Sequence, residues 1–193
     1  MSTSTSLKSS GAQGRNGRRE SGGKSLPLTV TRPELLNAGS DRDFRAFVHG
    51  ILAFSARLEA VRAGFGGIVG LTGIQYTILI SVSHLELSGE VSVSRIAEQL
   101  HVSGAFVTIE CGKLLKQGLL TKRPDPRDRR RVCLGITRKG AELLERLAPI
   151  QAQVNDVLFA FLDGPQFQQF RGMVDRMTEC GDQAVALLKF LAR

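Results

Sequence analysis

The stretch RPDPRDRRRVCLGITRKG, from Arg123 to Gly140, decides how the rest of the chain is interpreted. Its first half crowds arginines around two prolines and two aspartates, which is typical of an exposed turn. Its second half alternates the apolar residues Val132, Leu134 and Ile136 with other residues, as a half-buried strand does. Thr137 then opens a helix. The stretch is therefore predicted to be the tip and second strand of a hairpin that leads into a helix.

Before this stretch, residues 91–120 predict two helices joined by a turn of three or four residues, a helix-turn-helix. Ser94 starts the first helix, which places Ile96, Ala97 and Leu100 on one face. His101 to Ser103 form the turn, and Ser103 caps the second helix. Gly118 ends that helix, in the position that favours a left-handed residue. The inward side chains of the second helix are Phe106 or Val107, Cys111, Leu114 and Leu115. The first strand of the hairpin then spans residues 119–123.

Apolar residues at three- and four-residue steps predict further helices on both sides of this region. Asp41 or Asp43 caps the first of them, and the glycines at 64, 66 and 67 end it. Thr72 caps the next helix, which closes near Gly89. The stripe contains Phe44, Phe47, Val48, Ile51, Leu52, Phe54, Leu58 and Val61 in the first helix and Tyr76, Leu79, Ile80 and Leu85 in the second.

After Gly140 one apolar stripe runs from Leu143 to Leu162, and Asp163, Gly164 and Pro165 break it. A last helix repeats residues in alternating steps of four and three, which is a heptad seam. The seam packs either on the chain's own core or against a second chain. Three long helices around a small central module favour a shared interface. The residues of the seam are Phe170, Val174, Met177, Gly181, Ala184, Leu188 and Leu191.

The chain carries a formal net charge of +8, and this excess is concentrated in two places. Residues 1–40 hold six Lys or Arg against two Glu, and residues 122–131 hold six against two Asp, so each segment contributes +4. The remainder of the chain is neutral. Such localised charge indicates contact with a polyanion, most commonly nucleic acid. A solvated, solubilising surface is the alternative.

Composition excludes several other classes. A hydrophobic content of 42% and a charged content of 23% indicate a globular protein. No apolar run approaches the roughly 18 residues of a membrane span, and no secretory signal is present, so we expect a cytoplasmic protein. Cys111, Cys133 and Cys180 are too widely spaced to indicate zinc or a disulfide framework. No catalytic arrangement or phosphate loop is present, so we predict neither an enzyme nor a cofactor.

Together these features resemble the MarR family of winged-helix transcription regulators over about residues 41–190. The most specific part is DPRDRR at 125–130, followed by VCLGIT at 132–137 and Gly140. LTGIQYTIL at 71–79 resembles the family's second helix, and SVSRIAEQLHVSGAFVT at 92–108 resembles its helix-turn-helix. The resemblance implies a mostly α fold with a small β-wing, combining a winged helix-turn-helix with a helical dimerisation domain.

The resemblance also implies a division of the chain. Residues 1–40 are a flexible basic tail, and residues 41–193 are the MarR-type domain. Within it, 41–70 and 141–193 are dimerisation helices and 71–140 are the DNA-binding module. The implied partners are a pseudo-palindromic double-stranded DNA operator, a second copy of the chain and a small-molecule effector, with no membrane. The implied activity is repression that ends when an organic anion, an aromatic carboxylate or acyl-CoA thioester, releases the DNA.

The expected DNA contacts come from the wing and the helix-turn-helix. Wings lie over the minor groove, whose negative potential attracts arginine. Arg129 and Arg131 are the leading candidates there, with Arg127, whereas Arg130 either contacts DNA or pairs with an aspartate of the turn. Phe106 either fills the core or touches a thymine methyl. The candidates on the helix-turn-helix are Ser94 and Arg95 for phosphate, and Ser103, Ala105, Phe106, Thr108 and Lys113 for the major groove.

The expected effector residues are Arg45, His49, Arg57, Tyr76, Ser83 and His84. Their basic character suits an organic anion, although such histidines are often structural. Two other functions stay open. One is a cysteine-based redox sensor acting through Cys111 in the second helix of the helix-turn-helix. The other is a winged-helix interaction module that does not bind DNA, because Glu110 would repel phosphate if it pointed outward and Gly104 and Gly112 weaken that helix.

Overall fold

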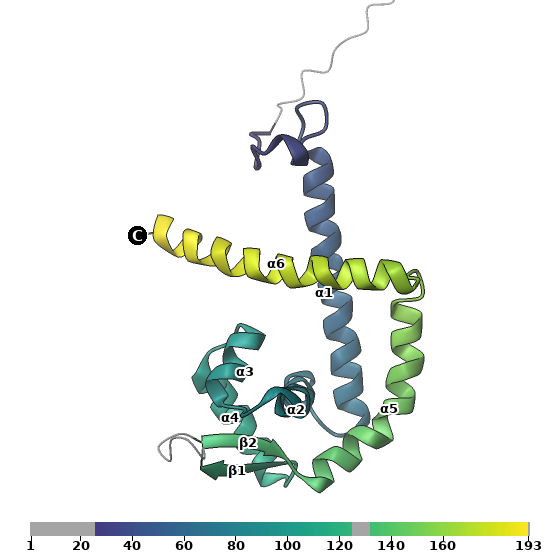
Figure 1. Ribbon diagram of the computed structural model, residues 1–193, viewed down its shortest axis with the longest axis vertical. Coiled ribbons are helices and arrows are strands. Elements are labelled where there is room, and N and C mark those ends of the chain that lie inside the picture. Colours follow the sequence, from purple (N-terminus) through teal and green to yellow (C-terminus); the bar gives the residue numbers. More distant parts are fainter. Residues whose placement is uncertain (1–25, 125–131, 193) are drawn as a thin grey trace, which may run out of the picture. The chain divides into compact units, whose positions relative to one another are not determined.

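The computed structural model describes residues 26–124 and 132–192 (Figure 1). It comprises two compact units, one ending at Ile51 and the other beginning at Leu52. A helical protein with one two-stranded antiparallel sheet was predicted, and this architecture is confirmed. The elements are η1 (Pro33–Leu35), α1 (Arg42–Ile68), α2 (Gly73–Leu85), η2 (Glu86–Ser88), α3 (Val93–Leu100), α4 (Gly104–Lys116), β1 (Leu120–Pro124), β2 (Val132–Ile136), α5 (Arg138–Leu158) and α6 (Gly164–Leu191).

The first unit is organised around the carboxylate of Asp41, which is only 6% exposed. The backbone and hydroxyl of Thr29 both donate to Asp41 Oδ2 at 2.8 Å, and Arg45 Nη2 lies 2.9 Å from the same oxygen. Hydrogen bonds from Arg45 and then Thr29 hold the pKa of Asp41 well below its usual range. Arg45 also donates to the carbonyl of Pro27. These bonds fix residues 27–29 to the start of α1.

Helix α1 continues further than the sequence predicted. The glycines at 64, 66 and 67 were expected to end it, but it runs to Ile68 and is closed by Gly70 in the left-handed region, at φ 73°. Leu71 N–H donates to Gly66 C=O at 2.8 Å and Gly70 N–H to Gly67 C=O at 3.2 Å, the pattern of a Schellman cap. A Cβ at Gly66 would lie 2.8 Å from the carbonyl oxygens of Leu71 and Thr72, so this glycine permits the sharp reversal into α2.

Helix α2 forms the centre of the second unit. Thr72 caps it as predicted, with a reciprocal capping box in which Thr72 Oγ1 accepts from Gln75 N–H and Gln75 Oε1 accepts from Thr72 N–H. Ile78, Leu79 and Val82 are fully buried. Figure 1 shows α3, α4 and the hairpin gathered in one cluster around α2. The core that they share also includes Ile96, Val107, Leu114, Leu119, Leu134 and Leu147.

The helix-turn-helix is confirmed, with one correction. Helix α3 starts at Val93 and is capped by Ser92, whose hydroxyl accepts from Arg95 N–H at 3.2 Å, so Ser94 is not the first residue of the helix. His101 adopts the left-handed conformation at φ 51° and ends α3. Ser103 caps α4 as predicted, and Gly118 follows α4 in the left-handed region at φ 70°.

Strands β1 and β2 pair antiparallel, with Leu120 opposite Ile136 and Pro124 opposite Val132. The segment before α3 pairs with β2 at one point, where Leu134 N–H donates to Val91 C=O at 2.8 Å. Glu86 at the end of α2 accepts a bond from Ile136 N–H at 3.1 Å. The base of the hairpin is therefore tied to both ends of the segment that leads from α2 to α3.

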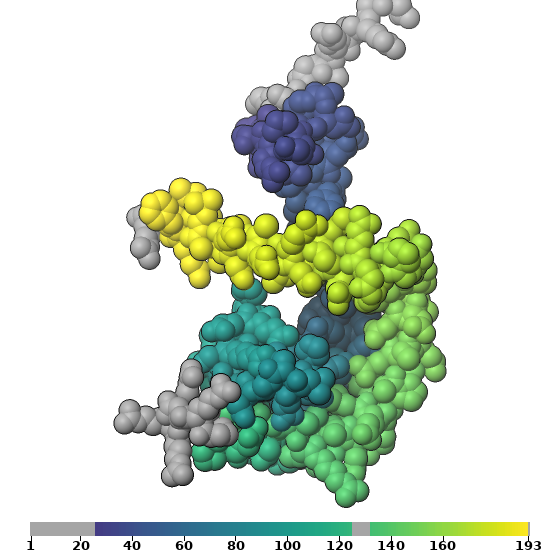
Figure 2. Space-filling model, in the orientation of Figure 1, coloured from purple at the N-terminus to yellow at the C-terminus, as the bar shows by residue number. Residues whose placement is uncertain are grey.

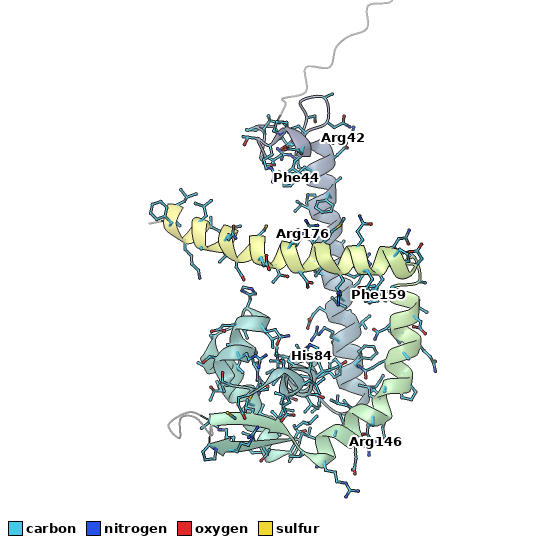
Figure 3. All side chains as sticks on the ribbon, in the orientation of Figure 1. Arg42, Phe44, His84, Arg146, Phe159 and Arg176 are labelled. Carbon is cyan, nitrogen blue, oxygen red and sulfur yellow. The ribbon has the colours of Figure 1, made fainter. Side chains whose placement is uncertain are left out.

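Helix α5 begins directly after β2. Thr137 caps it by accepting from Gly140 N–H at 3.0 Å, and the same hydroxyl donates to Gly118 C=O at 2.7 Å. The apolar stripe was predicted to continue to Leu162, but α5 ends at Leu158 and Asp163 caps α6 with Gln166. Just after α5 comes Phe159, which is labelled in Figure 3. The centroid of its ring lies 6.3 Å from that of Phe54 of α1. Helix α6 buries none of its residues.

Candidate nucleic-acid interface

Helices α3 and α4 form a helix-turn-helix whose two caps are serine hydroxyls. Ser103 Oγ accepts from Phe106 N–H at 3.2 Å, so the first turn of α4 begins at a fixed residue. Val107, Cys111 and Leu114 of α4 are buried at 0–1% exposure, which resolves the alternative between Phe106 and Val107 in favour of Val107. Phe106 remains 39% exposed. The helix thus keeps one side in the core and leaves the other open.

The open side of α4 contains the residues that the sequence proposed for the major groove. Ser103, Ala105, Phe106, Thr108 and Lys113 are all exposed. Thr108 Oγ1 donates to Gly104 C=O at 2.8 Å, so this hydroxyl is engaged with its own helix. Ile109, which the sequence analysis did not select, is also on this side and is 60% exposed. The alternation of buried and exposed positions along α4 was the signal that could have found it.

Glu110 points inward, not toward solvent. Gln75 Nε2 of α2 donates to Glu110 Oε2 at 3.0 Å, and Lys113 Nζ lies 2.7 Å from Glu110 Oε1. The bond from Lys113, opposed by burial and supported by Gln75, lowers the pKa of Glu110. The carboxylate is therefore a buried link between α2 and α4. The condition under which Glu110 would repel phosphate, an outward side chain, is not met.

Replacing Glu110 with glutamine is expected to lower the free energy of unfolding at pH 7 by about 1–2 kcal/mol, because the amide has one acceptor oxygen where the carboxylate offers one to each of its two donors, Gln75 and Lys113. The pKa of Glu110 is lowered in the folded state. Its stabilisation is therefore fully present above the ordinary carboxyl pKa of about 4.3 and is lost as the pH falls through the lowered value. Urea unfolding at pH 7 and at about pH 3 should show the difference between E110Q and wild type shrink in acid. Glu145→Gln, an exposed change on α5, is the control, and a difference independent of pH would contradict this role.

The predicted phosphate contacts lie at the start of α3. Ser94 is exposed, whereas Arg95 is half-buried and donates to Glu90 C=O at 3.0 Å and to Ser88 Oγ at 2.8 Å. On β1, Arg123 pairs with Glu90 at 2.9 Å and Lys122 is exposed. Arg127, Arg129, Arg130 and Arg131 of the predicted wing lie outside the residues that the structure describes.

The predicted effector residues are divided between the two units. Arg45 and His49 belong to the first, and Arg45 is already paired with Asp41. In the second, Tyr76 is buried, its ring packs edge-on against Phe65, and its hydroxyl accepts a bond from Gln151 of α5. Arg57 donates to Ala53 C=O at 2.8 Å, Ser83 is half-buried, and His84, labelled in Figure 3, is exposed on α2.

Cys111 is buried in α4, and this burial, with a smaller contribution from Glu110, raises its pKa to about 11. A thiol with that pKa is about one part in ten thousand thiolate at pH 7, and the thiolate is the reactive form. We therefore expect Cys111 to react with iodoacetamide at pH 7 at least about a hundred times more slowly in the folded protein than in urea. Mass spectrometry of its peptide over time measures this ratio. Equal rates in both conditions would instead support the hypothesis that Cys111 is a redox sensor.

A polar contact joins the turn of the helix-turn-helix to α6. His101 Nε2 lies 2.9 Å from Asp182 Oδ1, and both side chains are more than half exposed. An open cleft of about 640 Å³ adjoins the pair, lined also by Glu98 and Lys189. Figure 2 shows α6, in yellow, exposed along its length.

Residues 26–124 and 132–192 contain no group of three His, Cys, Asp or Glu side chains arranged to hold a metal ion. In the same part of the chain no single helix is long and apolar enough to cross a membrane, and α1 with residues 73–88 meets that test only as a pair bent by 88°.

Comparison with known proteins places this interface in context. Residues 69–131 match the model of the MarR family. YhbI of Bacillus subtilis (strain 168), named as an HTH-type transcriptional regulator, is 30% identical over 112 residues, which cover 58% of this chain and 71% of that protein. The matched residues of the family model include α2, α3 and α4 and extend through β1.

Solved structures resemble the fold at lower identity. The MepR–DNA complex of S. aureus superposes with a TM-score of 0.54 at 18% identity, covering 77% of this chain and 99% of that one. A mutant MarR of E. coli complexed with operator DNA gives 0.57 at 15% identity, covering 70% and 95%. The transcriptional regulator SlyA gives 0.60 at 18% identity, covering 72% and 95%.

Proposed function

Because this chain belongs to the MarR family of winged-helix transcription regulators, we propose that it is a repressor that binds double-stranded DNA through α4 and the hairpin. The observation that carries the proposal is that one side of α4 is exposed and free of acidic side chains, because Glu110, the acidic residue of α4, is turned into the core. A helix of this kind fits the major groove, in which sequence is read from base edges. Two relatives of similar fold were solved in complex with DNA.

Exposed cations at the end of α4 and on β1 suit the phosphates that border the groove. Lys116 is exposed at the end of α4, and Lys122 is exposed on β1. Residues 122–131 together carry a net charge of +4. Phosphate contacts supply affinity and its salt dependence, whereas contacts with bases supply sequence preference. We propose that Arg127, Arg129 and Arg131 contact the phosphates and the minor groove, that Arg130 either joins them or pairs with an aspartate of the turn, and that residues 94 and 95 contact phosphate.

We further propose that the protein acts as a homodimer on a pseudo-palindromic operator. Helix α6 exposes its apolar side chains, including Phe170 at 36%, Val174 at 43%, Met177 at 46% and Leu188 at 66%. These four residues lie on the heptad seam, and such a seam is buried when a second helix packs against it. A two-fold dimer presents two copies of α4 to half-sites about one helical turn apart.

For the effector we propose a small organic anion, an aromatic carboxylate or an acyl-CoA thioester, that favours the form unable to bind DNA. The cationic and polar candidates are those named above, from Arg45 to His84. Arg45 is engaged with Asp41, which leaves Arg57 as the exposed guanidinium of this set. We also propose that the protein has no catalytic role and that it acts in the cytoplasm.

Binding to duplex DNA across a series of salt concentrations tests the proposal. A fluorescent pool of random duplexes should bind with an affinity that falls steeply as salt rises, and added heparin, a competing polyanion, should displace it. Deleting residues 165–193 should produce monomers in sedimentation experiments and weaken binding. Benzoate or an acyl-CoA should then release DNA from the full chain. Salt-independent binding, or a monomer with unchanged affinity, would refute the proposal.

A further inference from the structure

We propose that Ile109 is a base-reading residue of α4, and that its contact with the 5-methyl group of thymine sets part of the sequence preference. This inference rests on the proposed binding of duplex DNA. It concerns a residue that carries no charge and no hydrogen-bonding group, so its contribution would be to specificity more than to the salt-dependent part of affinity.

The position of Ile109 on α4 is the first observation. Val107 and Cys111, two residues away on either side, are 0% and 1% exposed, whereas Ile109 is 60% exposed. Two steps along a helix with 3.6 residues per turn correspond to about half a revolution. Ile109 therefore projects from the side of α4 directly opposite the core, where a helix seated in the major groove would meet base edges.

The neighbours of Ile109 leave it prominent. Ala105, Ile109, Gly112 and Lys116 form one row along the helix at steps of four, three and four. Ala105 and Gly112 are small, and a Cβ at Gly112 would have no neighbour within 4 Å. Ile109 is thus a single large apolar side chain between two low positions. This profile lets the backbone of α4 approach the bases closely while one branched side chain reaches them.

The polar groups beside Ile109 are already engaged. Thr108 Oγ1 donates to Gly104 C=O, and Lys113 Nζ lies 2.7 Å from Glu110 Oε1. Ser103 Oγ accepts the capping bond from Phe106 N–H. The middle of this surface therefore offers apolar contact in place of the bidentate hydrogen bonds that read guanine or adenine. Thymine is the base that presents a methyl group in the major groove.

The charges around the row favour DNA over an apolar protein surface as its partner. Lys116 closes the row on the helix, and on the adjoining strand β1 Lys122 is exposed, whereas Arg123 is paired with Glu90 at 2.9 Å. Helix α4 packs against β1 within the same cluster (Figure 1). An apolar row that ends in a cation matches a groove whose floor carries methyl groups and whose edges carry phosphates.

Substitution of uracil for thymine tests the inference, because uracil lacks only the 5-methyl group. A random duplex pool is enriched on the wild-type protein and then amplified with either dTTP or dUTP. Affinities are measured by fluorescence anisotropy at one salt concentration. Wild type should bind the uracil pool about fourfold more weakly for each methyl contacted, or about 15-fold for two half-sites. Ile109→Ala should bind the thymine pool more weakly by a similar factor and should distinguish the two pools less than wild type does, by the factor for the lost methyl contact.

Leu87→Ala is the matched control, since Leu87 is an apolar residue of η2 that is 87% exposed and lies outside α4. It should keep both the affinity and the thymine preference of wild type. Equal binding of the two pools by wild type, or an undiminished preference in Ile109→Ala, overturns the inference while leaving DNA binding intact. Failure to bind either pool refutes the proposed function itself, so the two failures are distinguishable.

Discussion

Replacing Gly140 with alanine is expected to destabilise the protein by about 3 kcal/mol or more, which corresponds to a fall in Tm of about 10 °C for a chain of this size. A Cβ at Gly140 would lie 2.4 Å from the carbonyl oxygen of Leu119 and 2.9 Å from Cγ1 of Ile136. The first contact is with backbone, and that backbone is held by Thr137 N–H at 3.1 Å. The clash therefore cannot be relieved by turning a side chain, and it would separate α5 from the hairpin.

Gly64→Ala provides the control for this prediction. Gly64 is an exposed residue of α1, and a Cβ there would have no neighbour within 4 Å. The change should raise stability by up to about 1 kcal/mol, because alanine favours a helix more than glycine does. Thermal unfolding followed by circular dichroism measures both variants. If Gly140→Ala unfolded at the wild-type temperature, the close approach of α5 to Leu119 would not exist.

The triple variant with alanine at Arg127, Arg129 and Arg131 is expected to lose DNA affinity by about 100-fold or more at physiological salt. These residues supply half of the six cations of residues 122–131. Each phosphate contact that is lost should also reduce the slope of log affinity against log salt by about 1. Anisotropy titrations with a random duplex pool at several salt concentrations measure both quantities. We expect the folded stability to change little.

A second triple variant removes the same charge from other helices and serves as the control. Arg146 is exposed on α5 and labelled in Figure 3, and Arg171 and Arg176 are exposed on α6. With these three residues changed to alanine, the affinity should remain within a fewfold of wild type, provided that sedimentation shows the same oligomeric state. Equal losses in the two triple variants would mean that net charge, not the predicted wing, determines binding.

Much of the fold could be predicted because its signals are local. The capping residues Thr72, Ser103 and Thr137 stand immediately before their helices, and Gly118 follows α4. The errors arose where tertiary contacts decide. Either serine of the sequence SVS could cap α3, and Ser92 does so directly after Val91 joins the hairpin.

The candidate interface was predicted less completely for a similar reason. The partner of Glu110 that turns it inward is Gln75, which lies 35 residues earlier in the chain, and no local pattern connects the two. The glycines at 64, 66 and 67 predicted an end of α1 that was too early, because Gly66 lies inside the helix. A glycine is needed there since the backbone of Leu71 and Thr72 approaches it closely. Ile109 is 60% exposed, but an isoleucine in a helix with several buried apolar residues has the same local sequence signal as a core residue.

The exposure of α6 links the folding of this helix to the concentration of the protein. It spans 28 residues and buries none of them within its own chain. An isolated helix in water has little more than intrinsic propensity to hold it, and that margin is small. If α6 is held by a second copy, as in the homodimer proposed above, dilution separates the copies and should loosen this helix much as mild denaturant does. The number of copies in a cell would then determine how many are completely folded as well as how many operators are occupied.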